Sequence, residues 1–388
     1  MKKALRLFVV SMLVCASITS FAKDKKKKKE NLREFTPVIS LETTSVKDQN
    51  RTGTCWDFSA VSFIESELIR MGKGEHDISE MFSVRYAYPA KARKYLMLHG
   101  KYQFAQGGQA HDVTDVIRKY GMVPESVYAG LNYGKEKHEH GEMDAVLRSM
   151  MKAVVDGRRR NITEVWHKAF DAVLDVYLGE VPETFEYEGK TYTPITFRDA
   201  MGFNPDDYVE LTSYSYYPFY EKCQLEVPDN WSMAYYYNLP IDDLMKVMHY
   251  AMENGFTIEW DGDVSDTYFS HKNGVAFVPV KGWKKDMKIS KDDFIKQLHE
   301  EKNISQEDRD KAFFSFDTTD DHLMHLTGIV KDQKDVKYFV TKNSWDTDSN
   351  EFGGYLNMSE QFLRLRTVAI MVHKDAIPAD LKAKLNIK

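Results

Sequence analysis

The sequence VKDQNRTGTCWDFSA, residues 46–60, places a cysteine where it could act as a nucleophile. The segment CWDFSAVSFIESELIRM, which begins with Cys55, carries apolar side chains at helical spacing, so Cys55 is expected at or near the N-terminus of a helix. A helix N-terminus supplies positive potential and free N–H donors, and both favour the thiolate over the thiol. A buried structural thiol is the alternative, and position alone leaves both interpretations open.

A cysteine nucleophile also needs an imidazole that accepts and returns its proton, a polar group that orients the ring, and donors for the oxyanion of the tetrahedral intermediate. Gln49, six residues before Cys55, can offer a side-chain N–H, and Cys55 can offer its own backbone N–H. The small residues Gly53 and Thr54 would let a substrate approach closely. These residue types would suit a cysteine hydrolase, and the buried structural thiol stays the alternative.

The motifs around these residues resemble those of the papain-like cysteine peptidases. A glutamine six residues before a Cys-Trp pair, with FSA shortly after it, is similar to the nucleophile segment of that family, with Trp56 as a supporting residue. The segment DHLMHLTG resembles the family's histidine segment, in which the catalytic histidine lies six residues before a glycine. The resemblance therefore implies that His322, rather than His325, accepts the proton.

Two shorter motifs extend the resemblance. KNSW is similar to the family's asparagine segment, which implies that Asn343 orients the histidine ring and that Trp345 shields the contact between them. QGGQ is similar to the glycine pair whose backbone receives an extended substrate, which implies this role for Gly107 and Gly108. The resemblance implies a Cys-His-Asn site that acts on peptides and needs no metal or organic cofactor.

The spacing of the motifs indicates a branch of the family. His322 follows Cys55 by 267 residues, whereas about 130 to 150 residues separate the two in the short secreted members. Thr52 stands where those members often carry a disulfide cysteine. Both departures, and segments such as IRKYGMVPES and YYYNLPIDDLMKVM, resemble the bleomycin hydrolase and aminopeptidase C branch. That branch implies a thiol aminopeptidase, assembled as a homohexameric ring, whose C-terminus lies in each cleft and limits cleavage to residues near a free N-terminus.

The sequence leaves two alternatives, of which the first comes from its C-terminal segment. The segment DAIPADLKAKLNIK is short for a tail that carries a blocking carboxylate. The alternative activity is therefore that of an endopeptidase or a dipeptidyl-type peptidase. A non-enzymatic alternative is a silent, ring-forming homologue, and the four filled catalytic positions argue against it.

Changes of periodicity predict an α+β fold. Two apolar stripes at helical spacing, one through Met143, Leu147 and Val154 and the other through Val165 and Val176, predict a helical hairpin. The segments HLMHLTGIVKD, VKYFVTKNSW and GGYLNMS predict an antiparallel hairpin series. Together with the resemblance, they predict a papain-like two-lobed fold, with a helical lobe and an antiparallel β lobe, in one peptidase domain over residues 35–388 and with a helical insertion at about residues 135–205.

The N-terminal sequence MKKALRLFVVSMLVCASITSFA has a basic start, an apolar run and small residues near its end, which predicts a signal peptide over residues 1–22 and a periplasmic or secreted bacterial protein. Residues 23–34 are rich in lysine and are expected to form a flexible arm. Without residues 1–22 the chain has 50 basic and 59 acidic residues, which argues against nucleic acid as the main partner. No other apolar run is long enough for a stable membrane span.

Two acidic segments invite a metal interpretation. His322 and His325, preceded by Asp320 and Asp321, have a ligand spacing that is usable on a helix but not on a strand. The segment DGDVSD lacks the sixth-position glycine and the terminal glutamate of an EF-hand loop, and is expected to be an acidic turn. We therefore predict no metal site.

The sequence also predicts the surroundings of three further residues. Asp57 and Asp346 add negative charge near the predicted cleft, and the simplest expectation is that both side chains face solvent. A preference for basic residues or for a free amine is the sharper hypothesis. Cys223 has no obvious partner and is expected to be a structural thiol.

Overall fold

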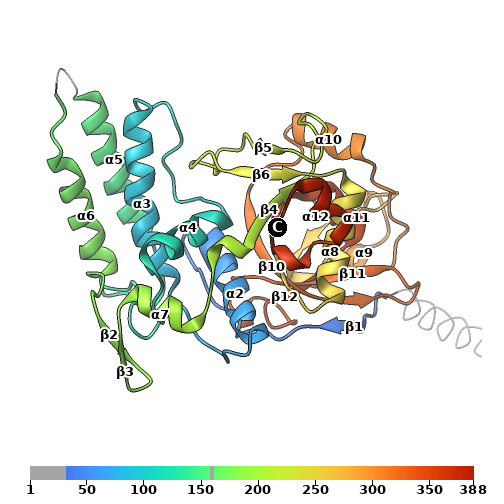
Figure 1. Ribbon diagram of the computed structural model, residues 1–388. Coiled ribbons are helices and arrows are strands. Elements are labelled where there is room, and N and C mark those ends of the chain that lie inside the picture. The colour runs from blue at the N-terminus through green and yellow to red at the C-terminus, as the bar shows by residue number, and fades with distance from the viewer. Residues whose placement is uncertain (1–31, 158–160) are drawn as a thin grey trace, which may run out of the picture.

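A computed structural model describes residues 32–157 and 161–388 (Figure 1). The predicted signal peptide and residues 23–31 of the lysine-rich arm lie outside the described residues, so both stay predictions. The last residues of that arm are packed, which differs from the flexibility expected for them. The N–H of Arg33 donates to the Lys296 carbonyl at 2.9 Å, and the Arg33 guanidinium lies 4.3 Å from the centroid of the Phe277 ring. A backbone hydrogen bond and a cation–π contact hold this segment in place.

Helix α2 (Cys55–Arg70) lies between the other helices of the first half and the sheet (Figure 1). Its residues 56–68 are all buried, because helices cover one side of it and the sheet covers the other. The predicted helix is thus confirmed, with Cys55 as its first residue. The remaining helices are α3 (Glu80–Met97), α4 (Ala110–Tyr120), α5 (Gly141–Asp156), α6 (Val165–Leu178), α7 (Pro194–Met201), α8 (Ile241–Glu253), α9 (Lys291–Ile295), α10 (Gln306–Phe314), α11 (Glu360–Arg366) and α12 (Ala379–Leu385).

The predicted helical hairpin is formed by α5 and α6; Met143 and Leu147 of α5 are buried as predicted, whereas the buried face of α6 differs from the predicted one. The side chains that pack inward include Met151 on α5 and Phe170 on α6, each in a row with residues four positions away. Val165 and Val176, expected in the buried stripe, are 64% and 66% exposed. Large side chains decide the packing, because Phe170 and Leu174 bury more apolar area than valines do. That the hairpin is an insertion relative to shorter relatives stays a prediction.

The strands of the second half form one large sheet in the described residues, in the order β5-β6-β4-β13-β7-β10-β11-β12-β9-β8, with β1 paired to β10. The predicted antiparallel series β10-β11-β12 is confirmed by the register of the strands. A separate hairpin joins β2 to β3. The strands are β1 (Thr36–Ser40), β2 (Phe185–Tyr187), β3 (Lys190–Tyr192), β4 (Tyr208–Thr212), β5 (Lys222–Gln224), β6 (Tyr235–Asn238), β7 (Ile258–Gly262), β8 (Phe269–Ser270), β9 (Val275–Ala276), β10 (His322–Lys331), β11 (Lys337–Lys342), β12 (Tyr355–Ser359) and β13 (Thr367–His373).

The central strands β4, β13, β7 and β10 place alternate side chains on opposite faces of the sheet. One row across them, which includes Trp260 and Met324, belongs to an apolar core that α8, α11 and α12 cover. The neighbouring rows face α2 and include Glu259, Asp261 and His325, all buried. Cys55 therefore lies where the helical part meets the polar face of the sheet.

Candidate active site

Cys55 is placed against two backbone N–H groups. The N–H of Trp56, from the helix N-terminus, and the N–H of Leu323, from β10, both point at the sulfur and favour its thiolate form. Burial acts in the opposite direction and is the larger effect, so it raises the pKa of the Cys55 thiol to about 12. The helix N-terminus thus does not by itself give the thiolate expected from the sequence, and the thiol keeps its proton at neutral pH.

His322 and Asn343 are brought together by the hairpin of β10 and β11. His322 is the first residue of β10, Asn343 follows the last residue of β11, and the His322 Nε2 atom lies 2.8 Å from Asn343 Oδ1. Asn343 Oδ1 also accepts the backbone N–H of Ser344 at 2.8 Å, which fixes it as the acceptor. His322 Nε2 must then carry the hydrogen, and Nδ1 presents a lone pair. Burial lowers the pKa of His322 to about 4, so the ring is a neutral base at physiological pH.

Aromatic rings enclose this contact. Trp345 lies with its ring centroid 4.9 Å from that of His322, in the place that the sequence predicted for the shielding ring. On the other side of Asn343, the Nδ2 group donates to His271 Nδ1 at 3.4 Å, and the His271 ring lies 4.9 Å from Trp345. His271 was given no role from the sequence, although it begins the segment HKNGVAFVP, which resembles the same branch, because it lies about fifty residues before His322. It holds the second end of the Asn343 amide.

Gln49 is buried and tied to the asparagine segment. Its Oε1 atom accepts the Ser344 hydroxyl at 2.6 Å, and its backbone N–H donates to the Ser344 carbonyl at 2.9 Å. Its Nε2 group donates to the Thr52 carbonyl at 2.9 Å. An amide nitrogen carries two hydrogens, so the contact with Thr52 leaves the second N–H of Gln49 free to donate. Ser344 was not singled out from the sequence, although it lies within the KNSW motif.

The glycine pair is held against the nucleophile segment by Gln106. The Gln106 side chain accepts the backbone N–H of Gly53 at 2.7 Å, and its carbonyl accepts the indole N–H of Trp56 at 3.0 Å. A side chain on Gly108 would lie 3.0 Å from the Trp56 ring, so glycine is required for this close approach. Gln106 is part of the QGGQ motif, but sequence reasoning gave it no role.

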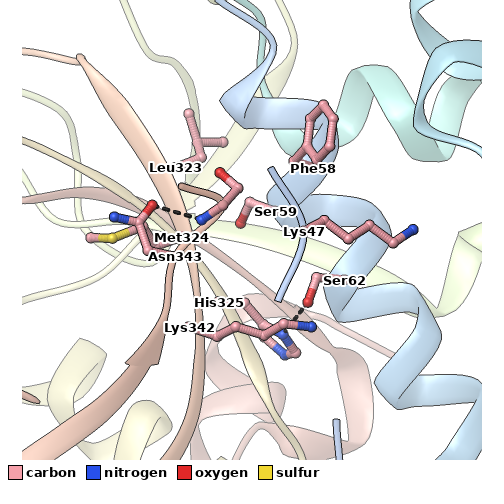
Figure 2. Close-up of a pocket in the computed structure, with 10 residues that line it drawn as sticks. Lys47, Phe58, Ser59, Ser62, Leu323, Met324, His325, Lys342 and Asn343 are labelled. Carbon is pink, nitrogen blue, oxygen red and sulfur yellow. Dashed lines mark hydrogen bonds between the residues drawn. The ribbon is translucent and has the colours of Figure 1, made fainter. Parts of the chain in front are cut away.

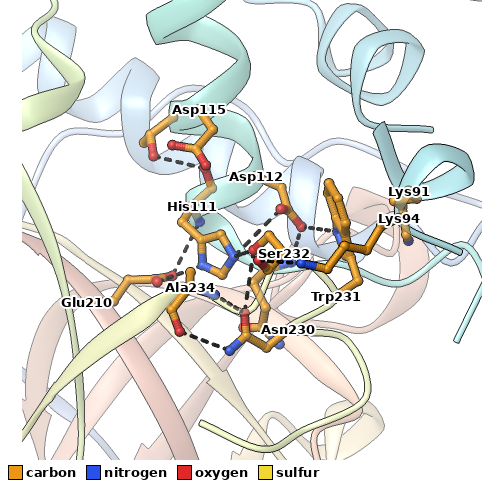
Figure 3. Close-up of polar contacts among 12 residues, drawn as sticks. Lys91, Lys94, His111, Asp112, Asp115, Glu210, Asn230, Trp231, Ser232 and Ala234 are labelled. Atoms are coloured by element: carbon orange, nitrogen blue, oxygen red, sulfur yellow. Dashed lines mark hydrogen bonds and ion pairs between the residues drawn. The ribbon is translucent and has the colours of Figure 1, made fainter. Parts of the chain in front are cut away.

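Polar contacts beyond the glycine pair fix the loop that faces it (Figure 3). The indole N–H of Trp231 donates to Asp112 Oδ2 at 2.7 Å, and Asp112 Oδ2 also accepts the Gln109 N–H at 2.9 Å. His111 lies between Glu210, at 2.7 Å, and Ser232, at 2.8 Å. Glu210 and Asp112 outweigh the effect of burial and raise the pKa of His111 to about 9. The loop that carries Trp231 is therefore anchored to α4 and β4.

His325 lies behind the site rather than in it. Figure 2 shows it beside a small cavity between α2 and β10, with room for about one water molecule. Its Nδ1 atom lies 2.9 Å from the Ser62 hydroxyl, and burial lowers its pKa well below the usual range. His322 and His325 start on opposite faces of a strand, and the described residues hold no group of three metal-ligating side chains.

The remaining sequence expectations have mixed outcomes. Asp57 is wholly buried, with no hydrogen-bond partner for its carboxylate within the described residues, so the expectation that it faces solvent is wrong. Asp57 sits in the first turn of α2, and that helix is enclosed on both sides. Asp346 is half-buried, and its side chain, 39% exposed, pairs with Lys137 at 3.1 Å, so it reaches solvent only in part. Cys223 is buried on β5. The segment DGDVSD was expected to be an acidic turn, but its first residues, including Asp261, form the end of β7.

Known proteins resemble this chain in sequence and in fold. Aminopeptidase W of Lactobacillus delbrueckii subsp. lactis is 24% identical over 385 residues, which cover 88% of this chain and 84% of that protein. Bleomycin hydrolase of Mus musculus is 22% identical over 404 residues, which cover 90% and 85%. The crystal structure of PepW from Lactobacillus rhamnosis has the same fold, with a TM-score of 0.70 at 21% identity, and the alignment covers 93% of this chain and 86% of that one.

The fold and the site define a cysteine peptidase with the papain-like two-lobed architecture. The sequence profile of the Peptidase C1-like family matches residues 89–388, and the chain belongs to that family. The match begins after Cys55 and Gln49, so the roles of these two residues rest on their motif and on the contacts described above. None of the helices in the described part of the chain is long and apolar enough to cross a membrane.

Proposed function

We propose that this protein is a thiol aminopeptidase that removes N-terminal residues from peptides. The observation that carries the proposal is the hydrogen bond between His322 and Asn343, because it leaves Nδ1 of a neutral imidazole free to take the proton of a thiol. The names of the relatives, aminopeptidase W and bleomycin hydrolase, support the substrate class.

The reaction follows from the positions of these groups. His322 Nδ1 takes the Cys55 proton as the substrate enters, and the sulfur attacks the peptide carbonyl. The second Nε2 hydrogen of Gln49 and the Cys55 N–H stabilise the oxyanion. The imidazolium then gives its proton to the leaving amine, and a water molecule, deprotonated by His322, hydrolyses the thioester. Asn343 keeps the ring in one tautomer throughout.

The test of the site is the variant Cys55→Ala together with labelling by an epoxide thiol inhibitor. We expect the variant to lose turnover while its melting temperature stays within a few degrees of the wild type. The wild type should bind one equivalent of inhibitor at Cys55, with Cys223 unlabelled because it is buried. Turnover by the variant, or a wild type that takes up no inhibitor, would instead support the silent homologue.

The endopeptidase and dipeptidyl alternatives differ from the aminopeptidase in how far from a free N-terminus the peptide is cleaved. The last helix, α12, packs on the core that α8 covers, and Ile387 contacts the same core on the sheet face opposite Cys55. Residues 379–388 thus lie on the core and outside the cleft, and the endopeptidase and dipeptidyl activities remain the alternatives to the aminopeptidase. Peptides with free and acetylated N-termini separate the two, since an aminopeptidase cleaves only the free form.

We also propose a cleaved signal peptide, a periplasmic or secreted location, and a homo-oligomer, with the hexamer as the expected form. The N-terminal sequence supports the first two. Val165 and Val176, exposed eleven residues apart on the same side of α6, support an interface between subunits. The mass of the intact protein exported by a bacterial host and light scattering after size exclusion test these points.

A further inference from the structure

A series of hydrogen bonds runs from His322 toward the surface and passes through His271. The half-buried ring of His271 lies at the start of a short 3-10 helix between β8 and β9. Its Nδ1 atom is 3.4 Å from Asn343 Nδ2, and its Nε2 atom is 2.7 Å from the Ser349 hydroxyl. The ring of Trp345 lies against both imidazoles, with a centroid distance of 4.9 Å to each. Asn343 therefore links the two histidines.

The direction of each hydrogen bond in this series follows from the donors. The Ser349 hydroxyl has one hydrogen, which it donates to the Asp346 carbonyl at 2.6 Å. Ser349 must then accept from His271, so His271 carries its hydrogen on Nε2 and presents a lone pair on Nδ1. The Asn343 amide leads to the same assignment, because its Oδ1 atom accepts the Ser344 N–H and its Nδ2 group faces His271. Neutral His271 is thus an acceptor for Asn343.

The backbone of His271 is held in place as well. Its carbonyl accepts the Asn350 side-chain N–H at 2.8 Å and the Gly274 N–H at 3.0 Å. The Asn350 amide also donates to the Tyr355 carbonyl at 2.9 Å, at the start of β12. Since β12 pairs with β11, the strand that leads into Asn343, the histidine and the asparagine are attached to the same part of the sheet.

Protonation of His271 would reverse its role toward Asn343. The imidazolium carries a hydrogen on both nitrogens, so Nδ1 would face the Nδ2 group of Asn343 with donor against donor. This repulsion is relieved when the amide turns, which brings Nδ2 toward His322 and the Ser344 N–H. The Nε2 atom of His322 must then accept, and its hydrogen is found on Nδ1 instead. In that tautomer His322 cannot take the proton of Cys55.

The ring of His271 is open to a proton from solvent. Ser349, at its Nε2 end, is exposed, and burial rather than a neighbouring charge lowers the pKa of His271. Burial lowers the pKa of His322 to about 4, and the charge of His271 lowers it as well. Because His322 is 4% exposed and His271 is half-buried, His271 takes up its proton first as the pH falls. The titratable groups around His271, with their ion-pair partners, are His322, Lys272 with Asp292, Asp346 with Lys137, Asp348 and Glu351.

We propose that neutral His271 is a positioning residue of the peptidase reaction, which holds the Asn343 amide in the orientation that makes His322 a base, and that protonation of His271 removes this base. The inference rests on the proposed function, since it concerns the same Cys-His-Asn site. Activity is then lost in mild acid while His322 is still neutral. The acid limb of the profile of kcat against pH reports His271 as well as His322.

The experiment measures kcat and KM of the full chain from about pH 4.5 to about pH 8, on a fluorogenic peptide with a free N-terminus and on its acetylated form. His271→Asn keeps an acceptor near the position of Nδ1 but cannot be protonated. His271→Phe keeps a ring against Trp345 but has no acceptor. The matched control is His373→Asn, because burial also lowers the pKa of His373. His373 stacks on Phe256, which contacts Arg70 at the end of α2 away from the nucleophile.

We expect His271→Phe to lower kcat roughly 3- to 10-fold at about pH 7.5 with little change in KM, because the Asn343 amide loses a contact that orients it. His271→Asn should keep kcat within about threefold of the wild type. Its acid limb should lie at lower pH, by about half a unit or more, whereas His373→Asn should leave the limb in place. Melting temperatures check that each variant folds, and His271→Gln replaces His271→Asn if that variant does not.

Three results would overturn the proposal. An acid limb that stays in place in His271→Asn would mean that protonation of His271 does not control the base. An unchanged kcat in His271→Phe would mean that the Asn343 amide needs no acceptor there. Equal losses of kcat in both variants would leave the ring with a structural role only. Failure of the peptidase function is recognised separately, by absent inhibitor labelling of Cys55 and no turnover by the wild type at any pH.

Discussion

The two faces of the central sheet carry opposite chemistry, although the same strands build both. Toward α8 the row Met324, Trp260, Ile370 and Leu211 is wholly apolar. Toward α2 the next row is mostly polar: it contains His325, Glu259, Met371 and Glu210. Asp261 lies in the following row on the same face. Both faces are buried, so burial alone does not explain the difference.

The polar face is joined to the helical part by paired contacts. Glu259 accepts the Ser59 hydroxyl at 3.1 Å, and His325 meets Ser62, so two residues one turn apart on α2 are matched to one strand row. Directional contacts of this kind fix the position of Cys55 over β10, whereas apolar contacts alone would allow sliding. Buried carboxyls add little stability. The apolar face therefore stabilises the fold, and the polar face sets the geometry of the site.

The largest loss of stability should follow from a substitution on the apolar face. Trp260→Ala removes a fully buried ring and its hydrogen bond to Thr367, which measures 2.8 Å. We expect it to lower the free energy of unfolding by about 3–5 kcal/mol, as measured by denaturant unfolding. Glu259→Gln, one residue earlier on the opposite face, is the matched control. A comparable loss in both variants would break the division of roles between the faces.

The second prediction concerns the rate of catalysis, which depends on His322 and Asn343 at the end of the polar face. Asn343→Ala removes the acceptor that holds the His322 hydrogen on Nε2, so the ring is free to adopt the wrong tautomer or to rotate. We expect kcat to fall on the order of 10²-fold while the melting temperature changes little. His271→Phe, which removes only the second contact of the amide, should cost less than Asn343→Ala. The reverse order would show that His271, rather than Asn343, governs the ring.

The sequence could predict the parts of the site whose signals are local. The helix that begins at Cys55, the antiparallel strands that carry His322, and Asn343 each follow from periodicity and a short motif, and the structure places all three together. Their catalytic roles stay predictions until variants are assayed. The fold class was predictable for the same reason.

The acids around Cys55 were not predictable from the sequence. Asp229 and Asp261 come from separate segments, and only the pairing of β7 with β10 and the anchored loop bring them to Asp320. The composition of DGDVSD indicated a turn, which hid the alternation of Trp260 and Asp261 on the last strand residues. Asp57 was misplaced for a related reason, since a charge in the first turn of a helix is usually solvated. Long-range packing, rather than local pattern, decided these positions.

A smaller effect sharpens the link between the polar face and the nucleophile. The charges of Asp229 and Asp320 add to the effect of burial and raise the pKa of the Cys55 thiol. Asp320→Asn removes one of them, so at alkaline pH more thiolate forms and alkylation by iodoacetamide should accelerate roughly two- to fivefold. Burial and the neighbouring acids raise the pKa of Asp320 itself to about 8. The rates of wild type and variant should therefore converge below pH 7, and a difference that persists at pH 6 would contradict the electrostatic explanation.

The smallest effect tests whether the polar face costs stability. Burial, followed by the charge of Glu210, raises the pKa of Glu259 well above its usual value, so the folded protein holds a proton there that the unfolded chain releases near pH 4.5. That proton contributes stability which is fully present below the unfolded pKa and is lost as the pH rises toward the folded pKa. Glu259→Gln keeps the acceptor for Ser59 without the titration. We expect the stability of the variant to decline less between pH 5 and pH 8 than that of the wild type, measured as unfolding free energy at each pH. Asp380→Asn, on the exposed surface, should leave the slope unchanged. If Glu259→Gln follows the wild-type slope as well, the carboxyl is ionised when folded, and the polar face must then be stabilised by a charge partner.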